Sequence, residues 1–258
     1  MNERIIGQVK RVNGPVIETM GITDPMMLEL VRVGEARLIG EVIKLEGDTA
    51  VIQVYEDTTG IAPGENIYGS GTLLSVELGP GLIGTIYDGI QRPLEEIYQV
   101  SHHFIERGIQ LPSLNRKKKW RFKPLLSTGV TVTPGMIAGT VQETENFVHR
   151  ILMPPDMRGV LKKILPEAEY TVDEPIAFVE TERGESPVYL MHTWPIRTPR
   201  PVTDRLPLNE PLITGQRVID ALFPVAKGGT VAAPGGFGTG KTMIQHAIAK
   251  WCEADIIV

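Results

Sequence analysis

The stretch Gly235-Gly236-Phe237-Gly238-Thr239-Gly240-Lys241-Thr242 has the pattern G-x-x-x-x-G-K-[ST], which is typical of phosphate-binding loops. Glycines allow the backbone to turn tightly, so that successive N–H groups point inward and form a nest for an anion. A helix that begins near Lys241 would add its positive end at the same place. The stretch therefore predicts a P-loop that binds a nucleoside triphosphate.

Two side chains of this loop have specific predicted roles. Lys241 is expected to be the catalytic residue, because its ammonium would reach the β- and γ-phosphates. Thr242 is expected to hold Mg²⁺ through its hydroxyl. The predicted cofactors are ATP or ADP with Mg²⁺, bound by eight residues: Gly235, Gly236, Phe237, Gly238, Thr239, Gly240, Lys241 and Thr242.

The residues around the loop predict one βαβ unit of a parallel sheet. Residues 215–223 have apolar residues at helical spacing, and a short strand is expected at 230–233. A helix is expected from Lys241 to about Glu253, followed by a strand from Asp255. Because one βαβ unit cannot bury both faces of its sheet, we expect the chain to stop inside a domain.

The preceding part of the chain has a different pattern, with short alternating strands and many turns. Residues 1–70 predict a small β-barrel, and 71–110 predict a glycine-rich linker with the first part of the nucleotide-binding domain. Residues 111–192 predict a β-rich insertion, and 193–258 the start of a RecA-like domain. The predicted fold class is α/β with an all-β N-terminal part.

The composition excludes several classes of protein. The chain has 258 residues, 42% of them hydrophobic and 22% charged, as in ordinary globular proteins. A net charge of −5 argues against a surface that binds nucleic acid throughout. A single cysteine, Cys252, cannot form an intramolecular disulfide, and no apolar run is long enough to span a bilayer. A cytoplasmic location is the default expectation.

Several motifs resemble the rotary ATPases, and most closely the catalytic A subunits of the V-type and archaeal (A-type) enzymes. The longest is Pro211-Leu212-Ile213-Thr214-Gly215-Gln216-Arg217-Val218-Ile219-Asp220-Ala221-Leu222-Phe223-Pro224, which precedes Lys227-Gly228-Gly229-Thr230 and the P-loop. Asn13-Gly14-Pro15-Val16 is similar to the barrel of that family. The family's insertion is matched by Ser113-Leu114, Arg116 to Lys119, Trp120 with Phe122, and Met191-His192-Thr193-Trp194-Pro195-Ile196-Arg197.

The resemblance implies an N-terminal portion of a translocase that couples ATP hydrolysis or synthesis to H⁺ or Na⁺ transport. It implies a hexameric ring in which the catalytic chain alternates with the family's B subunits, bound to central and peripheral stalk proteins. It also implies a location on the cytoplasmic face of the cell membrane, reached only through the assembled complex, and no nucleic-acid partner. The loop departs from the family pattern at Gly236, usually Pro or Ala, and at Thr239, usually Ser or Cys.

Two other functions are compatible with a P-loop. The chain by itself would be a non-catalytic nucleotide-binding or assembly fragment if it lacks the carboxylate that activates water. A RecA-like hexameric nucleic-acid motor would need aromatic and basic strands in its barrel. The predicted barrel is acidic and has Tyr55 as its single aromatic residue in the first ~65 positions, which disfavours this third hypothesis.

Other chemistry-bearing residues are interpreted as structural. The basic run from Arg116 to Lys123 is expected to be a solvated loop or subunit contact with two buried aromatics, rather than a nucleic-acid patch. His102-His103 lacks metal ligands at useful spacing and predicts a surface or capping role. Cys252 is expected to pack rather than react. The last group, a strand edge or turn rather than a catalytic pair, is Glu180, Glu182 and Glu185.

Overall fold

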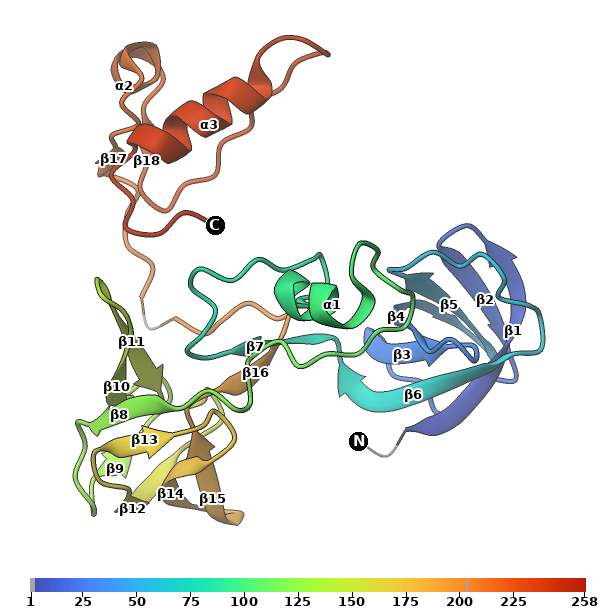
Figure 1. Cartoon of the computed structure of the whole chain (residues 1–258), viewed down its shortest axis with the longest axis horizontal. Helices are drawn as coiled ribbons and strands as arrows, with labels where there is room; N and C mark the ends of the chain where they lie inside the picture. Colours follow the sequence, from blue (N-terminus) through green and yellow to red (C-terminus); the bar gives the residue numbers. More distant parts are fainter. Residues whose placement is uncertain (1–2, 203) are drawn as a thin grey trace. The chain divides into compact units, whose positions relative to one another are not determined.

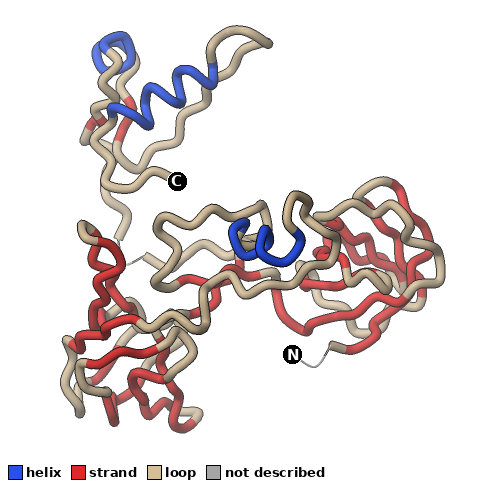
Figure 2. Tube along the Cα trace, in the orientation of Figure 1, coloured by secondary structure: helices blue, strands red, loops and turns tan. Residues whose placement is uncertain are grey.

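The computed structural model describes residues 3–202 and 204–258. The chain divides into two compact units, Met1–Pro199 and Arg200–Val258, which we call the first and the second unit. Figures 1 and 2 show that strands dominate the first unit, whereas the second contains two of the three labelled helices.

The first unit begins with a closed barrel of antiparallel strands in the order β1-β2-β5-β4-β3-β6. Apolar residues alternate along these strands, so that one face of each strand points into the barrel. Twelve buried residues, among them Ile6, Val31 and Ile52, form its core. The predicted barrel is confirmed, with the strands β1 Arg4–Asn13, β2 Val16–Met20, β3 Glu29–Val33, β4 Leu38–Glu46, β5 Thr49–Val54 and β6 Asn66–Leu73.

Strand β6 was not expected, because its glycines predicted a linker. It closes the barrel by pairing with β1 on one side and β3 on the other. Gly69 lies where a Cβ atom would come within 2.6 Å of the Glu29 carboxylate and 2.8 Å of Ile6. The glycine is therefore required by close packing inside a strand, and the linker interpretation is wrong for residues 66–73.

A short connecting region follows the barrel. Strand β7 (Ser75–Leu78) pairs antiparallel with β16 (His192–Pro195), so the two ends of the insertion lie side by side. Helix α1 (Leu94–Ser101) has Pro93 at its N-cap, Glu95 and Glu96 in its first turn, and one buried residue, Ile97. It confirms the expected turn or two of helix in this region.

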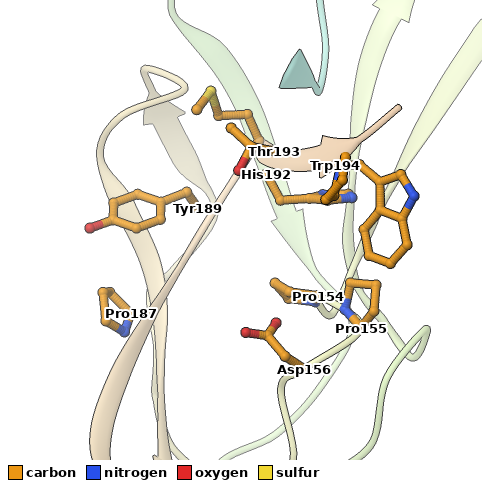
Figure 3. Close-up of a pocket in the computed structure, with 10 residues that line it drawn as sticks. Pro154, Pro155, Asp156, Pro187, Tyr189, His192, Thr193 and Trp194 are labelled. Carbon is orange, nitrogen blue, oxygen red and sulfur yellow. The ribbon is translucent and has the colours of Figure 1, made fainter. Parts of the chain in front are cut away.

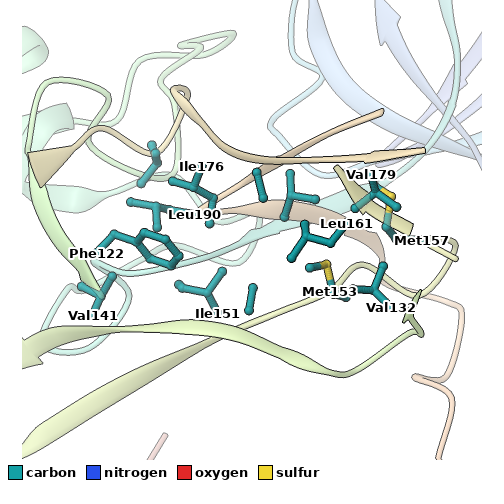
Figure 4. Packing of buried hydrophobic residues seen from close by; sticks show 14 of the residues in the cluster. Phe122, Val132, Val141, Ile151, Met153, Met157, Leu161, Ile176, Val179 and Leu190 are labelled. Atoms are coloured by element: carbon teal, nitrogen blue, oxygen red, sulfur yellow. The ribbon is translucent and has the colours of Figure 1, made fainter. Parts of the chain in front are cut away.

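The insertion consists of two four-stranded sheets, with the orders β11-β10-β8-β13 and β15-β14-β12-β9. Apolar side chains from both sheets, including Phe122, Val141, Leu161 and Val179, meet in a single buried cluster (Figure 4). The predicted β-rich insertion is confirmed. Its strands are β8 Trp120–Pro124, β9 Thr131–Val132, β10 Ile137–Thr144, β11 Phe147–Leu152, β12 Gly159–Ile164, β13 Ala168–Tyr170, β14 Pro175–Thr181 and β15 Gly184–Tyr189.

The second unit is smaller and has little regular sheet. Strands β17 (Pro211–Leu212) and β18 (Val225–Ala226) pair antiparallel, and helices α2 (Arg217–Leu222) and α3 (Lys241–Trp251) confirm the two expected helices. The strands expected at residues 230–233 and 255–258 are not formed. A strand needs a neighbour for its backbone hydrogen bonds, and the residues described in this unit provide none beside these two segments.

Candidate functional site

The candidate site is the loop of residues 235–240, which leads directly into helix α3. Gly238 and Gly240 have φ angles of 81° and 80°, in the left-handed region that other residues rarely adopt. Gly240 is the N-cap of α3. The two glycines therefore give the loop the tight curvature that a phosphate nest requires.

Helix α3 begins without a side chain to cap it. Its N-cap residue is glycine and makes no side-chain hydrogen bond, and the first helical bond runs from the N–H of Ile244 to the carbonyl of Gly240 at 3.0 Å. The N–H groups of Lys241, Thr242 and Met243 precede that bond and have no intrahelical acceptor. Free N–H groups together with the positive end of the helix favour a phosphate at this position.

The side chains of the loop are arranged around the same point. The ammonium of Lys241 donates a hydrogen bond to the carbonyl of Gly235, so the lysine folds back over the loop. The hydroxyl of Thr239 donates to the carbonyl of Gly236 at 2.9 Å and braces the turn. The structure thus brings the ammonium to the mouth of the glycine loop, which suits an anionic ligand.

The remaining predicted site residues are open to solvent. Thr242 lies in the first turn of α3 and is exposed, and Phe237 projects fully from the loop. Gly236 has an ordinary backbone angle and open space where a Cβ would stand. All eight predicted residues follow one another in the chain, so the loop presents them together.

A short hydrogen-bond network before α2, not predicted from the sequence, shapes the second unit. The carboxylate of Asp220 accepts hydrogen bonds from the Thr214 hydroxyl at 2.6 Å, the Thr214 N–H at 2.9 Å and the Gly215 N–H at 3.1 Å. The Thr214 hydroxyl, then its N–H, lowers the pKa of Asp220. A threonine shortly before a helix with an acid in that helix is the sequence signal for such a cap.

This network connects to the end of α3. Thr214 is fully buried, and a Cβ on Gly215 would come within 2.8 Å of Trp251. The N–H of Glu253 donates to the carbonyl of Ile213 at 3.2 Å. The segment before α2 therefore holds the C-terminal end of the helix whose N-terminus forms the candidate site.

The residues interpreted as structural lie where that interpretation expects them. Trp120 and Phe122 are buried, and Lys118 stands over the Trp120 ring at 3.9 Å. His102 is the C-cap of α1 and contacts Tyr98 edge-on. Cys252 is a half-buried free thiol at the end of α3.

The three glutamates behave in the same way. Glu180 lies in β14 and forms an ion pair with Lys162, and Glu185 lies opposite it in β15. Within residues 3–202 and 204–258 no cluster of three or more metal-ligating side chains is present. No helix in that part of the chain is long and apolar enough to cross a membrane.

Comparison with protein families gives three matches along the chain. Residues 9–71 match the β-barrel domain of the ATP synthase alpha/beta family. Residues 111–197 match the barrel-sandwich domain of the ATP synthase alpha/beta subunit. Residues 215–258, which contain the loop, match the nucleotide-binding domain of the ATP synthase alpha/beta family.

Curated relatives extend these matches to almost the whole chain. The chain is 54% identical over 254 residues to the A subunit of the A-type ATP synthase of Methanosphaera stadtmanae, covering 98% of this chain and 43% of that protein. It is 52% identical over 259 residues to the same subunit of Methanopyrus kandleri, and 51% identical over 253 residues to that of Metallosphaera sedula. The chain spans less than half the length of these relatives, 44% and 43% respectively.

Proposed function

Because the chain belongs to the ATP synthase alpha/beta family, we propose that it acts as the nucleotide-binding N-terminal portion of a catalytic rotary ATPase subunit. The proposed reaction is ATP synthesis or hydrolysis coupled to H⁺ or Na⁺ transport. The observation that carries this proposal is the loop itself, where two left-handed glycines, an uncapped helix start and the folded-back Lys241 converge.

Each part of the loop has a defined task in this proposal. The N–H groups of the first turn of α3 bind the phosphate oxygens, and Lys241 exchanges the Gly235 carbonyl for the β- and γ-phosphates. Its positive charge then stabilises the charge that develops during phosphoryl transfer. The Thr242 hydroxyl, exposed in the first helical turn, would ligate Mg²⁺, which would neutralise charge on the phosphates.

The proposed partners follow from the relatives' names, which place those proteins in A-type ATP synthases. We place this chain in a ring that alternates with the B subunits of such an enzyme, together with central and peripheral stalk proteins. It would reach the cytoplasmic face of the membrane through that assembly alone. The match of the barrel to the ATP synthase family favours this assembly over a nucleic-acid motor.

The first experiment measures binding of Mg·ATP and Mg·ADP to the 258-residue chain by calorimetry. Lys241→Ala is expected to weaken binding by at least ~10-fold, because a charge-assisted contact to phosphate is lost. Lys250→Ala removes the same charge from the last turn of the same helix and is expected to leave affinity unchanged. Equal losses in both variants would contradict a specific role for the loop.

The second experiment separates nucleotide binding from catalysis. The chain by itself is expected to bind nucleotide without turnover above the Lys241→Ala background. Turnover by the isolated chain above that background would instead exclude the non-catalytic fragment hypothesis. Binding without turnover, with turnover restored in a complete ring, would support the proposed role.

A further inference from the structure

A pocket of about 570 Å³ lies in the first unit, where the end of the insertion meets β16. Its walls are apolar and largely rigid. It is lined by the prolines Pro154, Pro155, Pro187 and Pro195, the aromatic residues Tyr189 and Trp194, and Asp156, Met191, His192 and Thr193. Figure 3 shows Tyr189 and Trp194 on opposite sides of the pocket, with Asp156 between them.

Asp156 is the only carboxylate among these lining residues. It is exposed and stands in the turn Pro154–Met157, which is closed by a hydrogen bond from the N–H of Met157 to the carbonyl of Pro154 at 3.0 Å. Among the residues that the structure describes, Asp156 forms no hydrogen bond or ion pair. Arg158 and Arg183 line a neighbouring depression that shares Asp156, yet neither pairs with it.

The shape of the pocket is fixed by contacts of its own walls. Tyr189 is the last residue of β15 and lies opposite Pro175 in the sheet, and Trp194 lies in β16 opposite Val76. The indole N–H of Trp194 donates to the carbonyl of Thr198 at 2.8 Å. These contacts and the prolines leave few torsions to be ordered when a ligand binds, which favours affinity.

We propose that this pocket binds a lysine or arginine side chain of an extended, proline-containing segment of a partner protein. Aromatic rings attract a cation to their faces, and a nearby carboxylate supplies the opposite charge. Grooves lined by aromatic residues are also the usual receptors for polyproline segments, whose backbone is already ordered before binding. The overall charge of −5 favours a basic partner as well.

The probe for this proposal is the peptide acetyl-Pro-Pro-Lys-Pro-Pro-amide, titrated into the 258-residue chain while tryptophan fluorescence is recorded. A dissociation constant on the order of 1 mM or below is expected for so short a segment. The same peptide with glutamine in place of lysine is expected to bind at least about fivefold more weakly. Absence of binding by the lysine peptide, or equal binding of the two peptides, would overturn the proposal.

Variants assign the binding to the pocket. Asp156→Asn is expected to weaken the lysine peptide about fivefold and to leave the glutamine peptide unchanged. Asp48→Asn is the matched control, because it makes the same change in an exposed turn of the barrel. If Asp48→Asn lowers affinity as much as Asp156→Asn, the attraction is only the general charge of the chain, and the pocket is not the site.

The aromatic wall is tested in the same way. Tyr189→Phe keeps the ring and is expected to keep affinity, whereas Tyr189→Leu is expected to lose about threefold. A single capped lysine is the last arm, and it is expected to bind much more weakly than the peptide. If it binds as tightly as the peptide, the pocket holds a small cation and the proposed protein segment is excluded.

Discussion

The two units differ in where their apolar side chains lie. Every buried hydrophobic residue among those described belongs to the first unit, in the barrel cluster, the insertion cluster or α1. In the second unit Val218, Leu222 and Phe223 are exposed, and neither α2 nor α3 buries a residue. The difference teaches that stability is concentrated in the first unit, whereas the phosphate chemistry depends on local backbone geometry in the second.

The largest effect is expected from core phenylalanines. Phe122→Ala removes a fully buried ring from the insertion cluster and should lower the free energy of unfolding by about 3–5 kcal/mol. Phe223→Ala makes the same change on an exposed residue of the second unit and should change it by less than about 0.5 kcal/mol. Urea unfolding curves of both variants test this contrast, and equal losses would break the comparison.

The next effect concerns a buried charge near the end of the first unit. Arg197 donates to the fully buried carboxylate of Glu41 at 2.8 Å, and the Tyr55 hydroxyl donates to the same oxygen at 2.9 Å. Arg197→Met leaves Glu41 without its cation. The expected loss is about 2 kcal/mol, below the roughly 3–5 kcal/mol of a fully buried pair because Arg197 is 52% exposed.

The matched control for this variant is Arg4→Met. Arg4 pairs with Asp24 at 2.8 Å, but the two side chains are 48% and 86% exposed. Such surface pairs contribute no more than about 1 kcal/mol. Thermal unfolding of both variants gives the comparison, and the argument from burial is wrong if Arg4→Met costs as much as Arg197→Met.

A third effect depends on pH. Glu143 in β10 is 1% exposed, accepts hydrogen bonds from the N–H groups of Gly81 and Ile83, and contacts His149 Nδ1 at 2.7 Å. Burial alone would raise the pKa of Glu143, but the hydrogen bonds from His149, Gly81 and Ile83 outweigh it and lower the pKa. A lowered folded pKa means that this carboxylate stabilises the fold above its unfolded pKa.

That stabilisation should therefore be lost as the pH falls through the folded pKa, below about 4.3. Glu143→Gln is expected to cost about 1–2 kcal/mol at pH 7 and to lose less stability on acidification than the native chain. Unfolding measured between pH 7 and pH 3 provides the test. Parallel curves for the two proteins would show that Glu143 is not the group responsible.

The sequence predicted most of the fold where a signal is local. Alternation predicted the strands β1 to β5, and helical spacing predicted α2 and α3. Strand β6 was missed because Gly69 serves contacts with Ile6 and Glu29, which no local pattern reveals. The contact of Glu143 with Gly81 joins residues 62 positions apart and was invisible for the same reason.

The candidate site was predictable for the opposite reason. Its eight residues are contiguous, and the glycine and lysine spacing states the backbone geometry directly. The pocket at Asp156 was not predictable, because its lining comes from the turn near residue 155, from β15 and from β16. Sites built from one segment can be inferred from the sequence, whereas sites assembled by folding need the structure.

The smallest expected effect sharpens the comparison inside the loop. Gly236 has an ordinary φ angle and open space at its Cβ position, whereas Gly240 has a φ of 80°. Gly236→Ala should restrict the free loop by about 0.4–1 kcal/mol and tighten Mg·ATP binding about two- to fivefold. Gly240→Ala should weaken it, because alanine at a left-handed angle costs about 1–2 kcal/mol. Calorimetric titration of both variants tests the sign, and weaker binding by Gly236→Ala would show that the loop needs the freedom of its second glycine to close on phosphate.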